Sequence, residues 1–212
     1  MSLINDVIFQ ATRCLFIVLL KILANFRVYG RKNLPKNGPF IVASNHVSYV
    51  DPGVVAIACD GCRISFMAKR ELCESRTWNW WFNAMDSIPA DRTSRNFRSL
   101  KIAMKKLKNG GIVGIFPEGT RSLDGELKNA EPGIGLLAEK SGAPIIPIYL
   151  EGTSDVLPRG ARFLRMHPIV ARIGKAVNLD EAKSIHEKKA RYYHIGEKVM
   201  QAIKSLRNEE GY

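Results

Sequence analysis

The stretch "FIVASNHVSYVDPGVVAIA", residues 40–58, joins two apolar runs through a polar turn. The first run has the length and character of a buried strand. The second follows Asp51 and Pro52, and Asp followed by Pro is typical of a helix that begins with an N-cap and a proline at its first position. We therefore expect a strand, a turn and a helix here, with Asp51 as the N-cap.

The same alternation of strand-like and helix-like segments continues along the chain. The strand candidates are "FIVASN" (40–45), "ISFMAK" (64–69), "SIPA" (87–90), "GIVGIF" (111–116), "APIIPIYL" (143–150) and "IVARIGKAV" (169–177). The helix candidates are Pro52–Ala58, Trp78–Ala84, Arg95–Lys108, Ile134–Lys140 and Glu187–Leu206. Such alternation predicts an α/β fold, with a central, mostly parallel sheet flanked by helices. We expect this domain to span residues 27–212, beyond a separate N-terminal segment, residues 1–26.

Charge and composition narrow the class of partner. The chain has 32 Lys+Arg against 20 Asp+Glu, a formal net charge of +12, and a hydrophobic content of 46% that suits a globular protein. A basic protein attracts nucleic acid, an anionic membrane surface or a phosphorylated small molecule. No nucleic-acid motif with aromatics interleaved in a basic strand is present, so we expect no nucleic acid among the partners.

The N-terminal segment is apolar from residue 7 to residue 26, but only residues 14–20 are free of polar interruptions. The polar positions 6, 10, 13, 21 and 25 recur at helical spacing and form one narrow stripe. This pattern favours an amphipathic helix lying in a membrane interface over one that crosses the bilayer. A cleaved signal peptide and a helix packed on the protein's own core are the alternatives. The tryptophans in "WNWW" (78–81) are either core residues or anchors at headgroup level.

Four cysteines, Cys14, Cys59, Cys62 and Cys73, are too few for a disulfide framework in a chain of 212 residues. The "CDGC" stretch from Cys59 to Cys62 has the spacing of half a zinc site or of a redox pair, but no second ligand pair follows. We therefore expect reduced thiols and no metal, with Cys59 and Cys62 as small buried residues on either side of a helix-ending Gly61.

His46 and Asp51 stand five positions apart across the expected turn between strand and helix. Across such a turn, a carboxylate can accept a hydrogen bond from one ring nitrogen of histidine and leave the other nitrogen free as a base. The simpler alternative is that Asp51 only starts the helix. The pair by itself leaves both interpretations open.

Polar clusters follow four of the expected strands, at the ends where ligands bind in open α/β sheets. "FPEGTRS" (116–122) brings Glu118, Gly119 and Arg121 together, while Lys69 and Arg92 follow two other strands. Glu118 and Arg121 could form no more than a surface ion pair. Several basic side chains around one histidine and one glutamate nevertheless predict a phosphate-bearing substrate held beside a general base.

These motifs resemble those of the glycerolipid acyltransferases, the 1-acyl-sn-glycerol-3-phosphate acyltransferase family. "NHVSYVD" resembles the family's His-x4-Asp motif, and "FPEGTRS" matches its Phe-Pro-Glu-Gly-Thr-Arg-Ser motif in every residue. "SIPADR" resembles the intermediate Gly-x-x-Phe-Ile-x-Arg motif less well: it keeps Arg92 but has Met85 and Pro89 at two motif positions. "APIIPIYLEG" is similar to the fourth motif. The resemblance runs from about Val28 to Val177.

The resemblance implies transfer of a fatty acyl group from a thioester to the sn-2 hydroxyl of lysophosphatidic acid, giving phosphatidic acid. His46 would be the general base, Asp51 its orienting partner, and Glu118 would orient the acceptor or a basic neighbour. The phosphate would be bound by Lys69, Arg92 and Arg121, with Gly119 and Thr120 in the oxyanion or phosphate cradle. Ser48 would be a turn residue rather than an acyl carrier.

The implied partners are acyl-CoA or acyl-carrier protein (acyl-ACP) as donor, lysophosphatidic acid and an anionic membrane surface, without a cofactor. The interfacial helix and the net positive charge, which suit an enzyme acting on such a lipid, predict a peripheral, monotopic position on the cytoplasmic face of a membrane. Two alternatives stay open: another acceptor, such as a different lysophospholipid or a lyso-ornithine lipid, and a non-enzymatic protein that binds anionic membranes.

Overall fold

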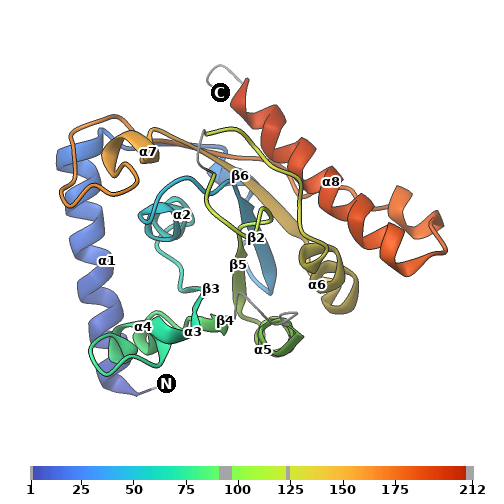
Figure 1. The fold of residues 1–212 in the computed structure, drawn as a ribbon, viewed down its shortest axis with the longest axis horizontal. Coiled ribbons are helices and arrows are strands. Elements are labelled where there is room, and N and C mark those ends of the chain that lie inside the picture. Colours follow the sequence, from blue (N-terminus) through green and yellow to red (C-terminus); the bar gives the residue numbers. More distant parts are fainter. Residues whose placement is uncertain (1, 91–96, 123–124, 209–212) are drawn as a thin grey trace.

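A seven-stranded sheet forms the centre of the computed structural model, which describes residues 2–90, 97–122 and 125–208 (Figure 1). The strands are β1 (Arg27–Tyr29), β2 (Phe40–Ser44), β3 (Ile64–Lys69), β4 (Ile88–Ala90), β5 (Ile112–Ile115), β6 (Ile145–Glu151) and β7 (Val170–Ile173). Their order in the sheet is β1-β7-β6-β2-β5-β3-β4.

The sheet is mostly parallel, as predicted. All neighbouring strands from β6 to β4 pair in parallel, and β7 is antiparallel to β6 and carries β1 parallel to itself. Each predicted strand is present, although the last is shorter than predicted, Val170–Ile173 instead of 169–177. β1 was not predicted, because its three residues show no strand-length apolar run and are followed by the turn-rich stretch "GRKNLPKNGP" (30–39).

Helices cover both faces of the sheet (Figure 1), with α1 and α2 on one side and α5, α6 and α8 on the other. The helices are α1 (Leu3–Ala24), α2 (Asp51–Ala58), α3 (Arg70–Cys73), α4 (Asn79–Ala84), α5 (Phe97–Lys108), α6 (Gly133–Ser141), α7 (Thr153–Val156) and α8 (Lys188–Arg207), with 3-10 turns at Arg31–Asn33 and Glu181–Ser184. The predicted helices are confirmed to within one or two residues at the described ends. The predicted start of α5 at Arg95 lies outside the described residues. The missed α3 and α7 are single turns, too short to show a helical period.

One of the two cores depends on a close approach between α1 and α2. Gly53 lies in the first turn of α2, where a Cβ atom would come within 2.2 Å of Cε1 of Phe16 on α1. The missing side chain therefore lets the Phe16 ring rest against the α2 backbone. Leu20 and Ala24, the buried residues of α1, continue this contact into the core formed with the sheet.

Three polar residues of α1 contact the rest of the protein: Asp6, Thr12 and Arg13. The Asp6 carboxylate pairs with Arg63 at 2.9 Å, and Nε1 of Trp81 on α4 donates to Thr12 Oγ1 at 3.2 Å. Arg13 Nη2 donates to the carbonyl of Asp60 at 3.4 Å. Part of the predicted polar stripe therefore attaches the helix to the rest of the protein, because Asp6 and Arg13 have hydrogen-bond partners there.

The outward side of α1 is apolar and exposed. Its large hydrophobic residues recur at helical spacing and are at least half exposed: Leu3, Ile4, Val7, Leu15, Val18 and Ile22. Within the described ranges, α1 is the one helix that could cross a bilayer by length and composition, a test that soluble core helices and signal sequences also pass. A helix that exposes so many large apolar side chains, while several of its polar side chains contact the protein, differs from the usual surface helix of a soluble protein. The separation of residues 1–26 from 27–212 stays a prediction.

The cysteine and tryptophan expectations are corrected in part. Cys59 is buried, and burial raises the pKa of its thiol to about 12, whereas Cys62 is exposed rather than buried because it lies beyond the end of α2. Trp78 and Trp80 are about half exposed at 53% and 50%, so the tryptophan cluster is not an ordinary core.

Candidate active site

The polar loops predicted to converge lie along one edge of the sheet. β2, β5, β3 and β4 are consecutive parallel neighbours, so their carboxyl ends share that edge. The segments from His46 and from Phe116 begin directly after β2 and β5, and Lys69 is the last residue of β3. Arg92 lies outside the described residues. Apart from Arg92, the sequence-predicted site residues thus come from neighbouring strand ends.

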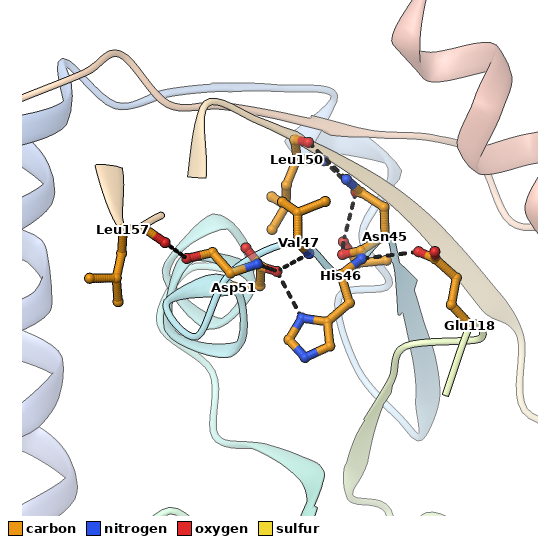
Figure 2. A network of polar contacts seen from close by, with 9 residues as sticks. Asn45, His46, Val47, Asp51, Glu118, Leu150 and Leu157 are labelled. Atoms are coloured by element: carbon orange, nitrogen blue, oxygen red, sulfur yellow. Dashed lines mark hydrogen bonds and ion pairs between the residues drawn. The ribbon is translucent and has the colours of Figure 1, made fainter. Parts of the chain in front are cut away.

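His46 and Asp51 form a hydrogen-bonded pair, shown in Figure 2. Nδ1 of His46 lies 2.8 Å from Oδ2 of Asp51, and the same oxygen accepts the backbone N–H groups of Val47 at 2.7 Å and Ser48 at 2.8 Å. The expected N-cap role of Asp51 is wrong: α2 begins at Asp51, and Val50 is its N-cap. The carboxylate turns back to the preceding turn because three donors converge on it there.

This pairing sets the state of the imidazole. Asp51 is fully buried, and its other oxygen, Oδ1, has no hydrogen-bond partner among the described residues. A buried carboxylate that accepts charge-assisted bonds on one oxygen favours a proton on the facing Nδ1 of His46. Nε2 then has a free lone pair and, in Figure 2, points away from Asp51. The His46 side chain keeps 18% of its surface exposed, so that a substrate can reach it.

A stack of aromatic rings fixes the plane of the imidazole. The Phe116 ring lies parallel to His46 with centroids 4.0 Å apart, and Phe66 from β3 stacks on Phe116 at 5.4 Å. Gly114 makes room for this stack, because a Cβ atom there would lie 2.2 Å from Cε1 of Phe66. The sequence showed an apolar strand but no sign that Gly114 and Phe66 support the histidine from behind.

The backbone of His46 is held by the loop after β5. Oε1 of Glu118 accepts the N–H of His46 at 3.2 Å, and the N–H of Ser122 donates to the His46 carbonyl at 2.8 Å. Oε2 of Glu118 accepts the N–H of Lys128 at 3.2 Å. Burial raises the pKa of the Glu118 carboxyl, and these two N–H groups partly offset the effect. In the structure, Glu118 therefore holds two backbone segments together.

Asn45 is a site residue that the sequence reasoning missed. Its buried side chain bridges to β6, where Nδ2 donates to the carbonyl of Leu150 at 2.9 Å and Oδ1 accepts the N–H of Leu150 at 2.8 Å. This pair of bonds extends the β2–β6 ladder by one residue beyond Ser44 (Figure 2). Its position before His46 in a polar turn was the available signal. Ser48 is buried in the turn, and its hydroxyl donates to the Leu157 carbonyl at 3.0 Å.

The rest of the "PEGTRS" loop offers exposed donors. Gly119 adopts the left-handed conformation, φ +69°, and its N–H donates to the Phe116 carbonyl at 3.0 Å, so that this N–H is already used inside the turn. The N–H groups of Thr120 and Arg121 have no acceptor within the described ranges. The Arg121 guanidinium lies 3.6 Å from the centre of the Tyr49 ring, in the loop that follows His46.

The described part of the chain contains no group of three or more His, Cys, Asp or Glu side chains able to hold a metal ion. The site presents a supported imidazole and a buried carboxylate, with the Arg121 guanidinium over the loop that follows His46.

An α/β sheet with a carboxylate-supported histidine at the carboxyl ends of its strands has the architecture of an acid–base enzyme. Residues 25–151 match the family model described as Acyltransferase. The chain belongs to the acyltransferase family, which confirms the resemblance given by its motifs.

Several known proteins are similar in sequence or structure to nearly the whole of this chain. It is 31% identical to a 1-acyl-sn-glycerol-3-phosphate acyltransferase of Bacillus subtilis, over 91% of this chain and 93% of that protein. It is 28% identical to Tafazzin of Drosophila melanogaster over 91% of this chain, but spans only 57% of that longer protein. The crystal structure of the 1-acyl-sn-glycerophosphate (LPA) acyltransferase PlsC from Thermotoga maritima superposes with a TM-score of 0.74 at 27% identity, covering 98% of this chain and 81% of that one.

Proposed function

We propose that this protein is a 1-acylglycerol-3-phosphate O-acyltransferase, which moves a fatty acyl group from a thioester to the sn-2 hydroxyl of lysophosphatidic acid and yields phosphatidic acid. The observation that carries the proposal is the 2.8 Å contact between His46 Nδ1 and Asp51 Oδ2 at the carboxyl edge of the sheet. The relatives named 1-acyl-sn-glycerol-3-phosphate acyltransferase support the choice of acceptor.

The chemistry requires a base and a stabilised oxyanion, since a thioester is already activated. Nε2 of His46 takes the proton of the acceptor hydroxyl as its oxygen attacks the thioester carbonyl. The tetrahedral intermediate then collapses, the carbon–sulfur bond breaks, and the imidazolium returns the proton to the leaving thiolate. Asp51 stays ionised throughout and stabilises the transient imidazolium.

The negative charge on the tetrahedral intermediate and on the acceptor phosphate must be stabilised by hydrogen-bond donors or cations close to it. The N–H groups of Thr120 and Arg121 are available for this, whereas the N–H of Gly119 already serves the turn. The Arg121 guanidinium, held over Tyr49, and the exposed Lys69 would bind the phosphate, together with Arg92. Glu118 acts by positioning His46 rather than by touching the acceptor.

The substrate lies in a membrane, and the outer face of α1 gives the enzyme a way to reach it. Six large apolar side chains on that face are at least half exposed, while polar partners hold the opposite face to the protein. We propose a peripheral, monotopic attachment through residues 1–26 to an anionic surface on the cytoplasmic side. The net charge of +12 supports this arrangement.

A thiol-release assay tests the activity. Wild type given lysophosphatidic acid and acyl-CoA or acyl-ACP should release free thiol and form phosphatidic acid, and His46→Ala should lose about 10²-fold or more in rate. Equal rates for the two proteins would reject the base assignment. Parallel assays with the two donors, and with a lysophospholipid that bears a headgroup or a lyso-ornithine lipid as acceptor, identify the preferred pair. Faster turnover on one of these other acceptors would reject lysophosphatidic acid as the substrate.

A further inference from the structure

The segment between α7 and β7 has an unusual composition. Residues 157–168 read "LPRGARFLRMHP", with three arginines, one histidine and no acidic residue. Apolar and basic side chains follow each other closely in its centre, from Arg162 to Met166. The acyl-transfer chemistry proposed above uses none of these side chains.

Large apolar side chains of this segment point into solvent. Phe163 is 83% exposed and Met166 is 75% exposed, the first being the most exposed large hydrophobic residue described. Arg159, Arg162 and Arg165 are also exposed. None of the salt bridges among the described residues involves these arginines. Exposed apolar side chains flanked by cations match a binding partner that has an apolar interior beneath an anionic surface layer.

Backbone hydrogen bonds fix this segment to the carboxyl end of α1. The N–H groups of His167 and Ile169 donate to the carbonyls of Leu23 and Ala24 at 3.1 and 2.8 Å. These carbonyls belong to the last turn of α1 and have no acceptor role within the helix. In Figure 1 the segment, drawn in orange beside α7, lies against the end of α1 opposite the N-terminus.

Side chains join the two elements as well. Leu164 lines an apolar crevice of about 30 Å³ together with Phe16, Leu20 and Leu23 of α1. Val18 and Ile22, on the outer face of α1, are 50% and 65% exposed within the same two turns of helix. The exposed apolar groups of the segment and of α1 are therefore carried by elements in direct contact.

We propose that residues 157–168 form a second membrane-binding element, which places Phe163 and Met166 at the boundary of headgroups and acyl chains while Arg159, Arg162 and Arg165 bind the phosphates of anionic lipids. An anionic bilayer is the occupant that matches both features, because arginine stems can lie along apolar surface while their guanidinium groups reach phosphate. The inference rests on the peripheral attachment proposed above, but not on the acyl-transfer chemistry.

Vesicle partitioning of the full chain tests the apolar contribution. Phe163→Ser combined with Met166→Ser should lower binding to phosphatidylglycerol–phosphatidylcholine vesicles at least tenfold, with the thermal midpoint unchanged because both side chains are exposed. The matched control is Tyr193→Ser on α8, which is 43% exposed on the opposite side of the sheet and should bind like wild type. Equal partitioning of the double variant and wild type would overturn the proposal.

Comparing anionic with neutral vesicles separates the contribution of the arginines to membrane binding from that of the apolar side chains. Replacing Arg159, Arg162 and Arg165 with glutamine should weaken binding to anionic vesicles several-fold and leave weak binding to pure phosphatidylcholine unchanged. The variant Phe163→Trp adds one tryptophan, whose emission is the difference between the variant and wild type. Doxyl-labelled lipid should quench this emission, and an absence of quenching would contradict insertion. His46→Ala should bind vesicles like wild type. Failure of the proposed activity would therefore appear in the thiol-release assay, and failure of the proposed membrane element in vesicle partitioning.

Discussion

Glu118 stands 72 positions after His46 in the chain and accepts the backbone N–H of His46 at 3.2 Å. Its second oxygen holds Lys128, and Ser122 of the same loop donates to the His46 carbonyl. The two most recognisable motifs of the sequence are thus joined through backbone contacts. A substitution in the "FPEGTRS" motif should therefore displace His46, the proposed base, in the other motif.

We expect Glu118→Gln to lower kcat by up to about 100-fold with a smaller effect on KM. The amide can accept only one of the two N–H groups and opposes the other, so that the His46 backbone shifts, and misplacements of about 1 Å carry costs of that size. Steady-state kinetics check the result. An unchanged kcat would show that these contacts do not position the base.

The raised pKa of Glu118 predicts a pH dependence of stability. Because burial raises the folded-state pKa above the ordinary 4.5, the folded protein holds this proton over a range where the unfolded chain has lost it. The contribution of Glu118 to the free energy of unfolding is therefore full below pH 4.5 and is lost as pH rises through the raised pKa. Urea titrations of wild type and Glu118→Gln between pH 4 and 7 measure this. Parallel curves would contradict it.

Asp51→Asn should reduce kcat by about 10²–10⁴-fold, the range that acid–base assistance contributes. The asparagine places either its NH2 group or its oxygen, a weaker acceptor than a carboxylate, against His46 Nδ1. The same atom also faces the N–H groups of Val47 and Ser48, which lose their carboxylate acceptor. Loss of buried hydrogen bonds should also cost about 1–3 kcal/mol of unfolding free energy. Asp155→Asn, an exposed carboxylate 3.9 Å from His167, is the matched control and should leave both quantities unchanged.

Gly114→Ala should lower kcat although residue 114 touches no reacting group. The new Cβ would lie 2.2 Å from Phe66, which must move and carry Phe116 away from the imidazole. We expect a stability cost of about 1–3 kcal/mol from the overpacking. Gly133→Ala, where the nearest atoms are 3.7 Å away, is the control and should be neutral or stabilising. A fully active Gly114→Ala variant would show that the stack does not orient His46.

Thr12 and Trp81 should contribute to holding α1 on the domain. A double-mutant cycle of Thr12→Val and Trp81→Phe should give a coupling of about 0.5–1.5 kcal/mol in the free energy of unfolding, the usual net value of one hydrogen bond. Trp80→Phe is the control, since the Trp80 ring donates to the Thr77 carbonyl at an exposed position. Additive effects at Thr12 and Trp81 would mean that this hydrogen bond does not help to hold α1 on the domain.

The alternation of apolar runs and turns determined most of the architecture before any coordinates. "FIVASN" and "GIVGIF" became neighbouring parallel strands, and the motifs that follow them met at one edge, because parallel strands expose their carboxyl ends on the same side of a sheet. Short elements such as β1 and α3 escaped prediction, since three or four residues show no measurable period.

The sequence alone predicted the features that matter for function: a histidine with a carboxylate, a glutamate–arginine loop and an apolar N-terminal helix. Only the tertiary structure decided their contacts. The Asp51 carboxylate turns toward His46 and away from capping its helix, Glu118 accepts two backbone N–H groups, and Asp6 and Arg13 of α1 contact the rest of the protein. The physical reason is the same in each case. A buried or half-buried polar group takes the partners that packing brings to it, and those partners come from residues distant in sequence.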